Sequence, residues 1–280
     1  MAARLVLAAA VLISLLLPAQ AHHIASHPVE EPDASTRSPS LTPTGVDLAL
    51  VLAVDVSPSM DIEELTLQRQ GFIEAFRSSE VHEAVRKGSA GRIVVMYVEW
   101  ADSSQQQVVI PWTVIELPAD GLAFAARLAG GSMHRGRHTS ISAVIDFGVR
   151  QLHESAVRAM RQAIDISGDG ANNQGRMVTV ARDEALAHDI TVNGLPIMLK
   201  RPAGTWETAE LDLYFRDCVI GGLGAFVIPV RQQGEFIEAI RLKILREIAD
   251  RPQARASVQL AGSEQSQCLH DPCSEEGSNC

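Results

Sequence analysis

Several features that assign a protein to a common class are missing from this sequence. Basic residues are not in excess: 24 Lys and Arg stand against 34 Asp and Glu in 280 residues, a formal net charge of −10. Because nucleic-acid-binding proteins usually carry a basic face, this balance argues against that class. The sequence also has no internal repeats, no phosphate-binding P-loop and no G-x-S-x-G nucleophile elbow, so the commonest nucleotide-binding and hydrolase signatures are absent.

Long apolar runs are missing beyond the first 21 residues, and those residues have the layout of a secretory signal peptide. Arg4 provides a positive charge, residues 5–17 are mostly apolar, and residues 18–21 end in an A-x-A pattern. The apolar stretch is short for a membrane span. We therefore expect cleavage after Ala21 and a mature chain that is exported, to the periplasm or outside the cell, without stable membrane insertion.

Cysteine is scarce and confined to the C-terminal part of the chain. The four cysteines are Cys218, Cys268, Cys273 and Cys280, and their spacing matches no zinc motif. Disulfides suit an exported protein, and four cysteines allow three complete pairings among which the sequence does not choose. If all four pair, Cys218 must tie the tail to the preceding domain.

Composition divides the mature chain into three parts. Residues 22–45 are rich in Ser, Thr, Pro and His, which predicts a flexible linker. Residues 46–250 contain all the periodic apolar segments and form the predicted domain. Residues 251–280 are rich in Ser, Glu, Gln and Cys, so we expect a polar tail that is mobile except where disulfides hold it.

Strand-like and helix-like stretches alternate through the predicted domain. Strands are expected at 48–54, 92–100, 107–112, 163–167, 190–197 and 224–229, and helices at 62–76, 117–128, 140–152, 175–188 and 236–249. This alternation predicts an α/β fold with a doubly wound, mostly parallel sheet and helices on both faces. The short polar gap between the second and third strands predicts one antiparallel edge strand.

The first strand leads into the most informative stretch. Residues 48–54 are almost continuously apolar, as expected of a strand buried on both faces. Asp55, Ser57 and Ser59 follow at alternate positions, just ahead of the helix at 62–76, for which Asp61 is a suitable N-cap. One acid and two hydroxyls therefore lie at the carboxyl end of a buried strand, where open α/β sheets bind ligands.

Two further loops place oxygen-bearing side chains at the same predicted edge of the sheet. Thr139 stands just ahead of a predicted helix, and Asp169 follows a predicted strand. Simpler explanations also exist, because Asp55 and Thr139 could cap helices and Asp169 could form a turn with Gly170. Nearby polar residues are expected to have structural roles: Asn172 and Asn173 as turn formers, and His134 and His138 as solvated or hydrogen-bonded loop residues rather than metal ligands.

The combination of these three loops resembles the metal-ion-dependent adhesion site (MIDAS) of von Willebrand factor A (VWA) domains. Asp55, Ser57 and Ser59 match its D-x-S-x-S loop, Thr139 matches its second loop in a Gly-x-x-Thr context, and Asp169 matches its third loop. Asp169 lies in Ser-Gly-Asp-Gly, where many members of the family have Thr-Asp-Gly. The resemblance covers residues 46–249 and implies a VWA-like fold with a metal site.

A closer resemblance is to DUF1194, a family of bacterial exported VWA-like proteins. It depends on three stretches, residues 54–57, residues 165–173 and residues 214–226. The resemblance implies the fold and the metal site but no known activity.

The donor types favour a hard cation. Two Asp carboxylates with Ser and Thr hydroxyls suit Mg²⁺ or Mn²⁺, whereas Ca²⁺ prefers more carboxylates and Zn²⁺ prefers nitrogen and sulfur. In VWA domains such an ion bridges the domain to an acidic side chain of a partner. The resemblance thus implies a metal-dependent module that binds a protein or peptide carboxylate.

Two other functions fit parts of the pattern. Asp55, Asp169 and Mg²⁺ could serve a hydrolase or a phosphoryl-transfer enzyme. Haloacid-dehalogenase-like enzymes, however, need a second acid two residues after the nucleophile, and Ser57 occupies that position. The other alternative is a scaffold whose site has lost its metal, although all five candidate ligands are present. We therefore expect a binding module rather than an enzyme.

Overall fold

The computed structural model describes residues 45–200 and 210–249. The predicted signal peptide, nearly all of the predicted linker and the predicted tail lie outside the described residues. Within the described part of the chain, no helix is both long and apolar enough to cross a membrane.

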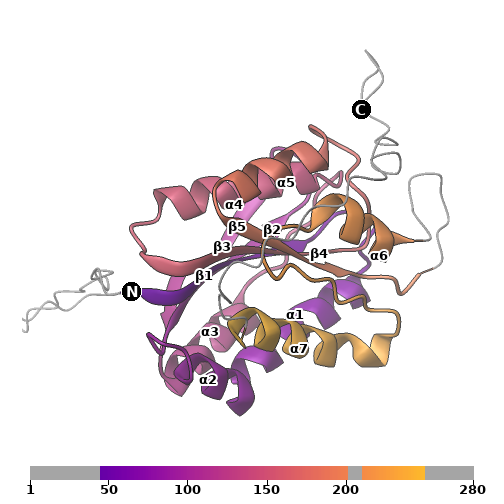
Figure 1. The fold of residues 1–280 in the computed structure, drawn as a ribbon. Helices are drawn as coiled ribbons and strands as arrows, with labels where there is room; N and C mark the ends of the chain where they lie inside the picture. The colour runs from indigo at the N-terminus through magenta and orange to yellow at the C-terminus, as the bar shows by residue number, and fades with distance from the viewer. Residues whose placement is uncertain (1–44, 201–209, 250–280) are drawn as a thin grey trace, which may run out of the picture. The chain divides into compact units, whose positions relative to one another are not determined.

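Strands and helices alternate along the described chain (Figure 1). The strands are β1 (Val46–Asp55), β2 (Ile93–Trp100), β3 (Gln106–Ile115), β4 (Ala159–Gly168) and β5 (Ile190–Pro196). The α-helices are α1 (Ile62–Arg77), α2 (Ser79–Arg86), α3 (Pro118–Gly130), α4 (Ile141–Glu154), α5 (Val178–Ala187), α6 (Leu211–Tyr214) and α7 (Phe236–Ala249). A π-helical turn, η1 (Phe215–Val219), and a 3-10 turn, η2 (Gln233–Glu235), complete the described elements.

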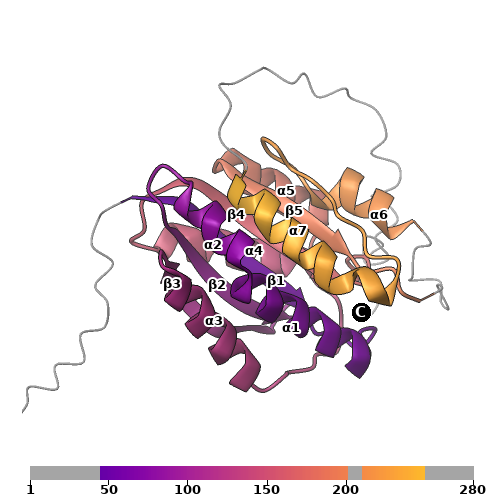
Figure 2. The ribbon, with the colours of Figure 1, turned by 90° about the horizontal axis from the view of Figure 1, so that it is seen from below.

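The five strands form one sheet in the order β3-β2-β1-β4-β5. All neighbouring strands are parallel except β2 and β3, so the predicted antiparallel edge strand is confirmed. Helices α4 and α5 cover one face, while α1, α2, α3 and α7 cover the other (Figures 1 and 2). The chain therefore has the doubly wound α/β fold expected from the sequence.

Strand β1 lies at the centre of the sheet and divides the core in two. Leu48, Leu50 and Leu52 belong to the core on the side of α1, α3 and α7. Ala49 and Val51 belong to the core on the side of α4 and α5. Because each face of the strand meets a layer of helices, nearly every residue of β1 is buried, which explains its continuous apolar run.

The predicted strand at residues 224–229 is wrong. This segment runs beside β5 but makes only isolated bridges with it, such as the one between Val227 and Gly194. Pro229 has no N–H group, so it cannot donate to a regular ladder. Strand β5 is therefore the last regular strand at this edge of the sheet.

The segment that follows β5 forms α6 and η1 beside this edge of the sheet. Gly221, just after η1, bridges Val192 of β5. Cys218 is fully buried in η1. The other three cysteines lie outside the described residues, so their pairing stays a prediction.

Helix α7 is held to the sheet by a buried polar cluster. Lys243 forms an ion pair with Asp165 of β4, and Glu247 accepts a hydrogen bond from Asn193 Nδ2 of β5 at 2.7 Å. These four side chains are at most 2% exposed. Burial, reinforced by the charge of Asp165, raises the pKa of Glu247 to about 8. Because a buried charge without its partner is costly, this cluster makes the position of α7 sensitive to the loss of any member.

Candidate metal centre

Asp55 ends β1 and is fully buried. Its Oδ1 atom accepts a hydrogen bond from the main-chain N–H of Ser57 at 2.7 Å. Its Oδ2 atom is buried and has no hydrogen-bond partner among residues 45–200 and 210–249. Gln68 of α1 donates to the main-chain oxygen of Asp55 at 3.0 Å and so fixes the end of the strand. A buried carboxylate oxygen without a donor is unusual and calls for a cation or an ordered water.

Asp55 is not a helix cap. The N-cap of α1 is Asp61, whose side chain accepts hydrogen bonds from the main-chain N–H groups of Glu63 and Glu64. Glu64 in turn accepts from the main-chain N–H of Asp61 at 2.9 Å, which completes a capping box. The predicted role of Asp61 is confirmed, and the capping explanation for Asp55 is excluded.

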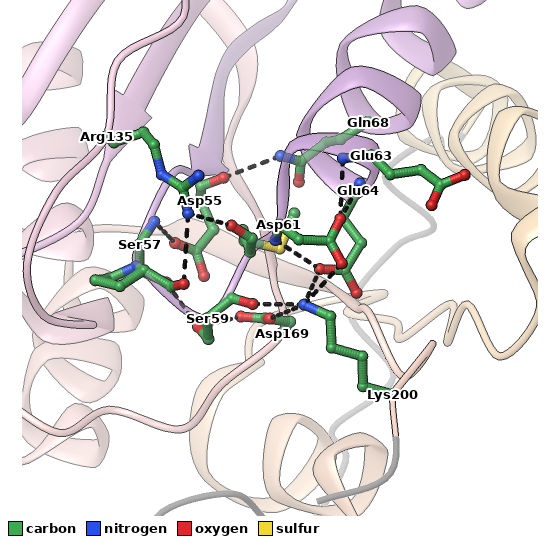
Figure 3. Close-up of polar contacts among 12 residues, drawn as sticks. Asp55, Ser57, Ser59, Asp61, Glu63, Glu64, Gln68, Arg135, Asp169 and Lys200 are labelled. Atoms are coloured by element: carbon green, nitrogen blue, oxygen red, sulfur yellow. Dashed lines mark hydrogen bonds and ion pairs between the residues drawn. The ribbon is translucent and has the colours of Figure 1, made fainter. Parts of the chain in front are cut away.

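The hydroxyls of the D-x-S-x-S loop connect it to the loop after β4 (Figure 3). Ser57 Oγ lies 3.0 Å from Ser59 Oγ, and Ser59 Oγ donates to Asp169 Oδ1 at 2.6 Å. The side chain of Asp169 is only 8% exposed. Two loops that are 110 residues apart in the sequence therefore share a hydrogen-bonded set of oxygen atoms.

Thr139 lies beside this set of oxygen atoms, on the second loop. It is 3% exposed and precedes Ser140, the N-cap of α4, whose hydroxyl donates to Gln174 O instead of capping the helix. A Cβ atom placed on Gly170 would lie 3.7 Å from Thr139 Oγ1 and 3.9 Å from Ser59 Oγ. All three loops thus meet at Gly170, and the five predicted site residues lie at one edge of the sheet.

Asn172 and Asn173 hold the second and third loops together, a role that the sequence analysis missed. The main-chain N–H of Thr139 donates to Asn173 Oδ1 at 2.9 Å, and the N–H of Asn173 donates to Thr139 O at 2.8 Å. The N–H of Ser142 donates to Asn172 Oδ1 at 3.0 Å. Their position three and four residues after Asp169, at the end of a strand, is the only sequence signal for this role.

A buried ion pair positions the loop that leads to Thr139. Arg69 of α1 pairs with Glu99 at the end of β2 and donates to Gly131 O at 2.6 Å. The main-chain N–H of His134 donates to Glu99 Oε2 at 3.1 Å, and its Nδ1 lies 2.7 Å from the same oxygen. His134 is thus a hydrogen-bonded loop residue, as expected.

The main chain of Gly168 packs closely against the unpartnered carboxylate oxygen of Asp55. A Cβ atom at this position would lie 2.7 Å from Asp55 Oδ2, closer than real Cβ atoms come to other atoms. Glycine therefore lets the main chain approach the Asp55 carboxylate, and a side chain at position 168 would displace that carboxylate. The orphaned oxygen of Asp55 and the converging hydroxyls of Ser57 and Ser59 together fit a divalent cation with hard oxygen ligands.

The carboxylates of Asp55 and Asp169 are not fully offset by nearby positive charge. Burial, reinforced by the charge of Asp169, raises the pKa of Asp55 to about 8. Burial also raises the pKa of Asp169 to about 6, although the Ser59 hydroxyl opposes the shift. Within the described residues, no group of three or more His, Cys, Asp or Glu side chains could hold a metal ion. A metal here would depend on the hydroxyls as well as the two carboxylates.

Two basic side chains that the sequence analysis missed reach the same loop. Arg135 Nη2 donates to Met60 O at 2.7 Å, and Lys200 Nζ donates to Ser59 O at 2.5 Å (Figure 3). Each comes from an irregular segment, where no periodicity marks it. The D-x-S-x-S loop is therefore held by cations from two other parts of the chain.

The sequence matches the family described as "Protein of unknown function (DUF1194)" over residues 45–252. This chain belongs to the DUF1194 family. No curated protein sequence matches it.

Solved structures with the same fold include VWA domains and adhesins. The chain is similar to the von Willebrand factor type A structure from Catenulispora acidiphila (15% identity, TM-score 0.51), with 72% of this chain and 43% of that chain covered. It is also similar to proximal thread matrix protein 1 from the mussel byssus (14% identity, TM-score 0.52), with 72% of this chain and 48% of that chain covered. A third similar structure is the pilus adhesin SpaC from Lactobacillus rhamnosus GG in its open conformation (10% identity, TM-score 0.55), with 72% of this chain and 30% of that chain covered. The chain spans less than half of each of these proteins, and the likeness shows that this DUF1194 domain has a VWA-like fold.

Proposed function

We propose that this chain is an exported, metal-dependent protein-binding module. Asp55, Ser57, Ser59, Thr139 and Asp169 would hold a divalent cation, Mg²⁺ or Mn²⁺, as a MIDAS-type site. The observation that carries the proposal is the buried, unpartnered Oδ2 atom of Asp55, at the edge of the sheet where the three loops meet. The bound ion would supply a positive charge to which a carboxylate of a partner protein can bind.

Different residues of the chain would have different roles at such a metal site. Asp55 supplies the innermost negative charge, and its main-chain carbonyl is anchored by Gln68. Ser57 and Ser59 contribute neutral oxygen atoms, so the cation keeps much of its charge for a further ligand. Asn173 and the Arg69–Glu99 pair hold the Thr139 loop in place, which supports a preorganised site.

The surroundings of the site suit an acidic partner. Arg135 and Lys200 both contact the D-x-S-x-S loop, and Arg137 and His138 are exposed on the neighbouring loop. These basic groups gather here although the whole chain has a net charge of −10. Opposite charges around an interface speed association and select partners, which favours an acidic segment over a neutral one.

A binding role is favoured over hydrolysis or phosphoryl transfer. A serine, not a second acid, stands two residues after Asp55, and its hydroxyl lies against Ser59. Export of the chain is supported by the predicted signal peptide at residues 1–21.

An array of immobilised peptides tests the partner chemistry. The purified full chain would be applied to Asp- or Glu-containing peptides and to matched peptides with Asn or Gln, in Mg²⁺ and in EDTA. We expect binding only to acidic peptides, only with Mg²⁺, and not by Asp55→Ala. Asp183→Ala serves as the matched control, because Asp183 is a surface residue of α5 whose side chain is 62% exposed. Equal capture of acidic and amidated peptides, or capture in EDTA, would contradict the proposal.

A further inference from the structure

Lys200 places an ammonium group beside the candidate metal ligands. Its Nζ donates to Ser59 O at 2.5 Å and forms an ion pair with Glu64. The same atom lies 3.3 Å from Asp61 Oδ2 and 3.9 Å from Asp169 Oδ2. Figure 3 shows the side chain reaching these oxygens from the segment after β5. Lys200 therefore lies opposite Asp169, one of the two acids of the candidate metal site.

The acids that face Lys200 need a cation when no metal is bound. The side chains of Glu64 and Asp169 are only 4% and 8% exposed, and buried carboxylates are costly unless paired. One Asp169 oxygen accepts from Ser59 Oγ, and the other faces Lys200. The side chain of Lys200 is itself 44% exposed, so it can turn toward solvent without opening the core.

We propose that Lys200 is a tethered counter-cation that lowers the affinity of the centre for divalent cations. The inference rests on the proposed metal site. Lys200 partly offsets the charges of Asp169 and Glu64 in the metal-free protein, and a divalent ion bound to Ser59 and Asp169 would then lie close to the positive charge of Lys200. The ammonium also holds the Ser59 carbonyl, so its displacement changes the contacts of the D-x-S-x-S loop. The lysine therefore sets the cation concentration at which the site fills.

Coulomb repulsion gives the expected size of the effect. At the dielectric constant of water, which applies because the Lys200 side chain is 44% exposed, a unit charge about 6 Å from a divalent ion changes its affinity by about tenfold. Removing the charge of Lys200 should thus tighten Mg²⁺ binding. Keeping the charge but changing the side chain should leave the affinity near that of the wild type.

Calorimetric titration of Mg²⁺ into the full chain and three variants tests the inference. Lys200→Gln keeps a hydrogen-bond donor but loses the charge, and Lys200→Arg keeps the charge. Lys87→Gln loses a charge from the exposed end of α2, as a control for net charge. We expect binding about tenfold tighter in Lys200→Gln and unchanged within about twofold in the other two variants. Equal or weaker binding by Lys200→Gln would overturn the role of Lys200, because it would mean that the lysine organises the site instead of opposing the metal.

A second measurement uses the wild-type side chain. The chain has three lysines, Lys87, Lys200 and Lys243, so ¹³C-methylated lysine ammonium groups can be resolved by NMR. Mg²⁺ should shift the Lys200 signal and leave the Lys87 signal in place. Metal binding with no shift of Lys200 would contradict the inference. The proposed metal site itself fails if neither the wild type nor Lys200→Gln binds Mg²⁺ or Mn²⁺, whereas binding by the wild type without tightening in Lys200→Gln refutes only the role of Lys200.

Discussion

Mg²⁺ binding should release about one proton per ion near neutral pH, because a metal ligand must be deprotonated and the pKa of Asp55 is raised. That pKa is about 8, mainly through burial and then through the charge of Asp169. At pH 7 most Asp55 side chains of the metal-free protein are therefore protonated. A divalent cation needs the ionised form, so binding and deprotonation are coupled.

The size of the coupling follows from the two pKa values. A single group with a pKa of about 8 makes the apparent affinity about 50-fold weaker at pH 6 than at pH 8. Asp169, with a pKa of about 6, contributes about a further twofold at pH 6. We thus expect an overall change of about 100-fold across this range, with the affinity levelling off above pH 8.

The stability of the metal-free protein should fall as the pH rises, whereas its affinity for Mg²⁺ should rise. Asp55 and Asp169 hold protons more tightly in the folded than in the unfolded chain, whose Asp groups titrate near 3.8. Where the folded state binds more protons, the free energy of unfolding falls as the pH rises. The contribution from these groups is therefore fully present below pH 4 and is lost as the pH rises toward 8. Bound Mg²⁺ should offset most of this fall in the free energy of unfolding.

Calorimetry in two buffers with different ionisation enthalpies measures the released protons directly. At pH 7 we expect about one proton per Mg²⁺, and Asp55→Asn should show no proton-linked binding. An affinity that stays constant from pH 6 to pH 8, or binding without proton release, would refute the assignment of Asp55 as an ionised ligand.

Three other substitutions have defined outcomes. Gly168→Ala should weaken Mg²⁺ binding at least several-fold by calorimetry, because its Cβ would stand 2.7 Å from Asp55 Oδ2. Asp55→Asn should raise the melting temperature of the EDTA-treated protein at pH 8 but not at pH 5, since it removes a buried carboxylate that ionises only at the higher pH; an equal gain at both values would argue against this. Lys243→Met should lower the free energy of unfolding by about 3–5 kcal/mol in urea titrations, because Asp165 loses its buried partner; a loss under about 1 kcal/mol would show that Asp165 is neutral in the fold.

The positions of the five site residues could be predicted because they depend on local patterns. Asp55 and Asp169 each follow a buried strand, and parallel strands end at the same edge of a sheet. Thr139 stands ahead of an amphipathic helix, whose start also lies at that edge. Each inference needed only the neighbouring residues and the alternation of strands and helices.

The supporting contacts could not be predicted because they join distant segments. Lys200 meets Glu64 across 136 positions, and Arg135 meets Met60 across 75 positions. A lone basic residue in a loop has no periodicity that reveals its partner. The predicted strand at 224–229 failed for a related reason, since its apolar residues pack beside β5 without regular pairing.

Titration of Mg²⁺ and of Mn²⁺ into the full chain, beside Asp55→Ala and the surface control Asp183→Ala, tests the central claim most directly. We predict one ion bound per chain by the wild type and by Asp183→Ala, and none by Asp55→Ala. Equal binding by all three proteins would place the ion elsewhere. An absence of binding by the wild type at pH 8, where Asp55 is half ionised, would contradict the metal centre.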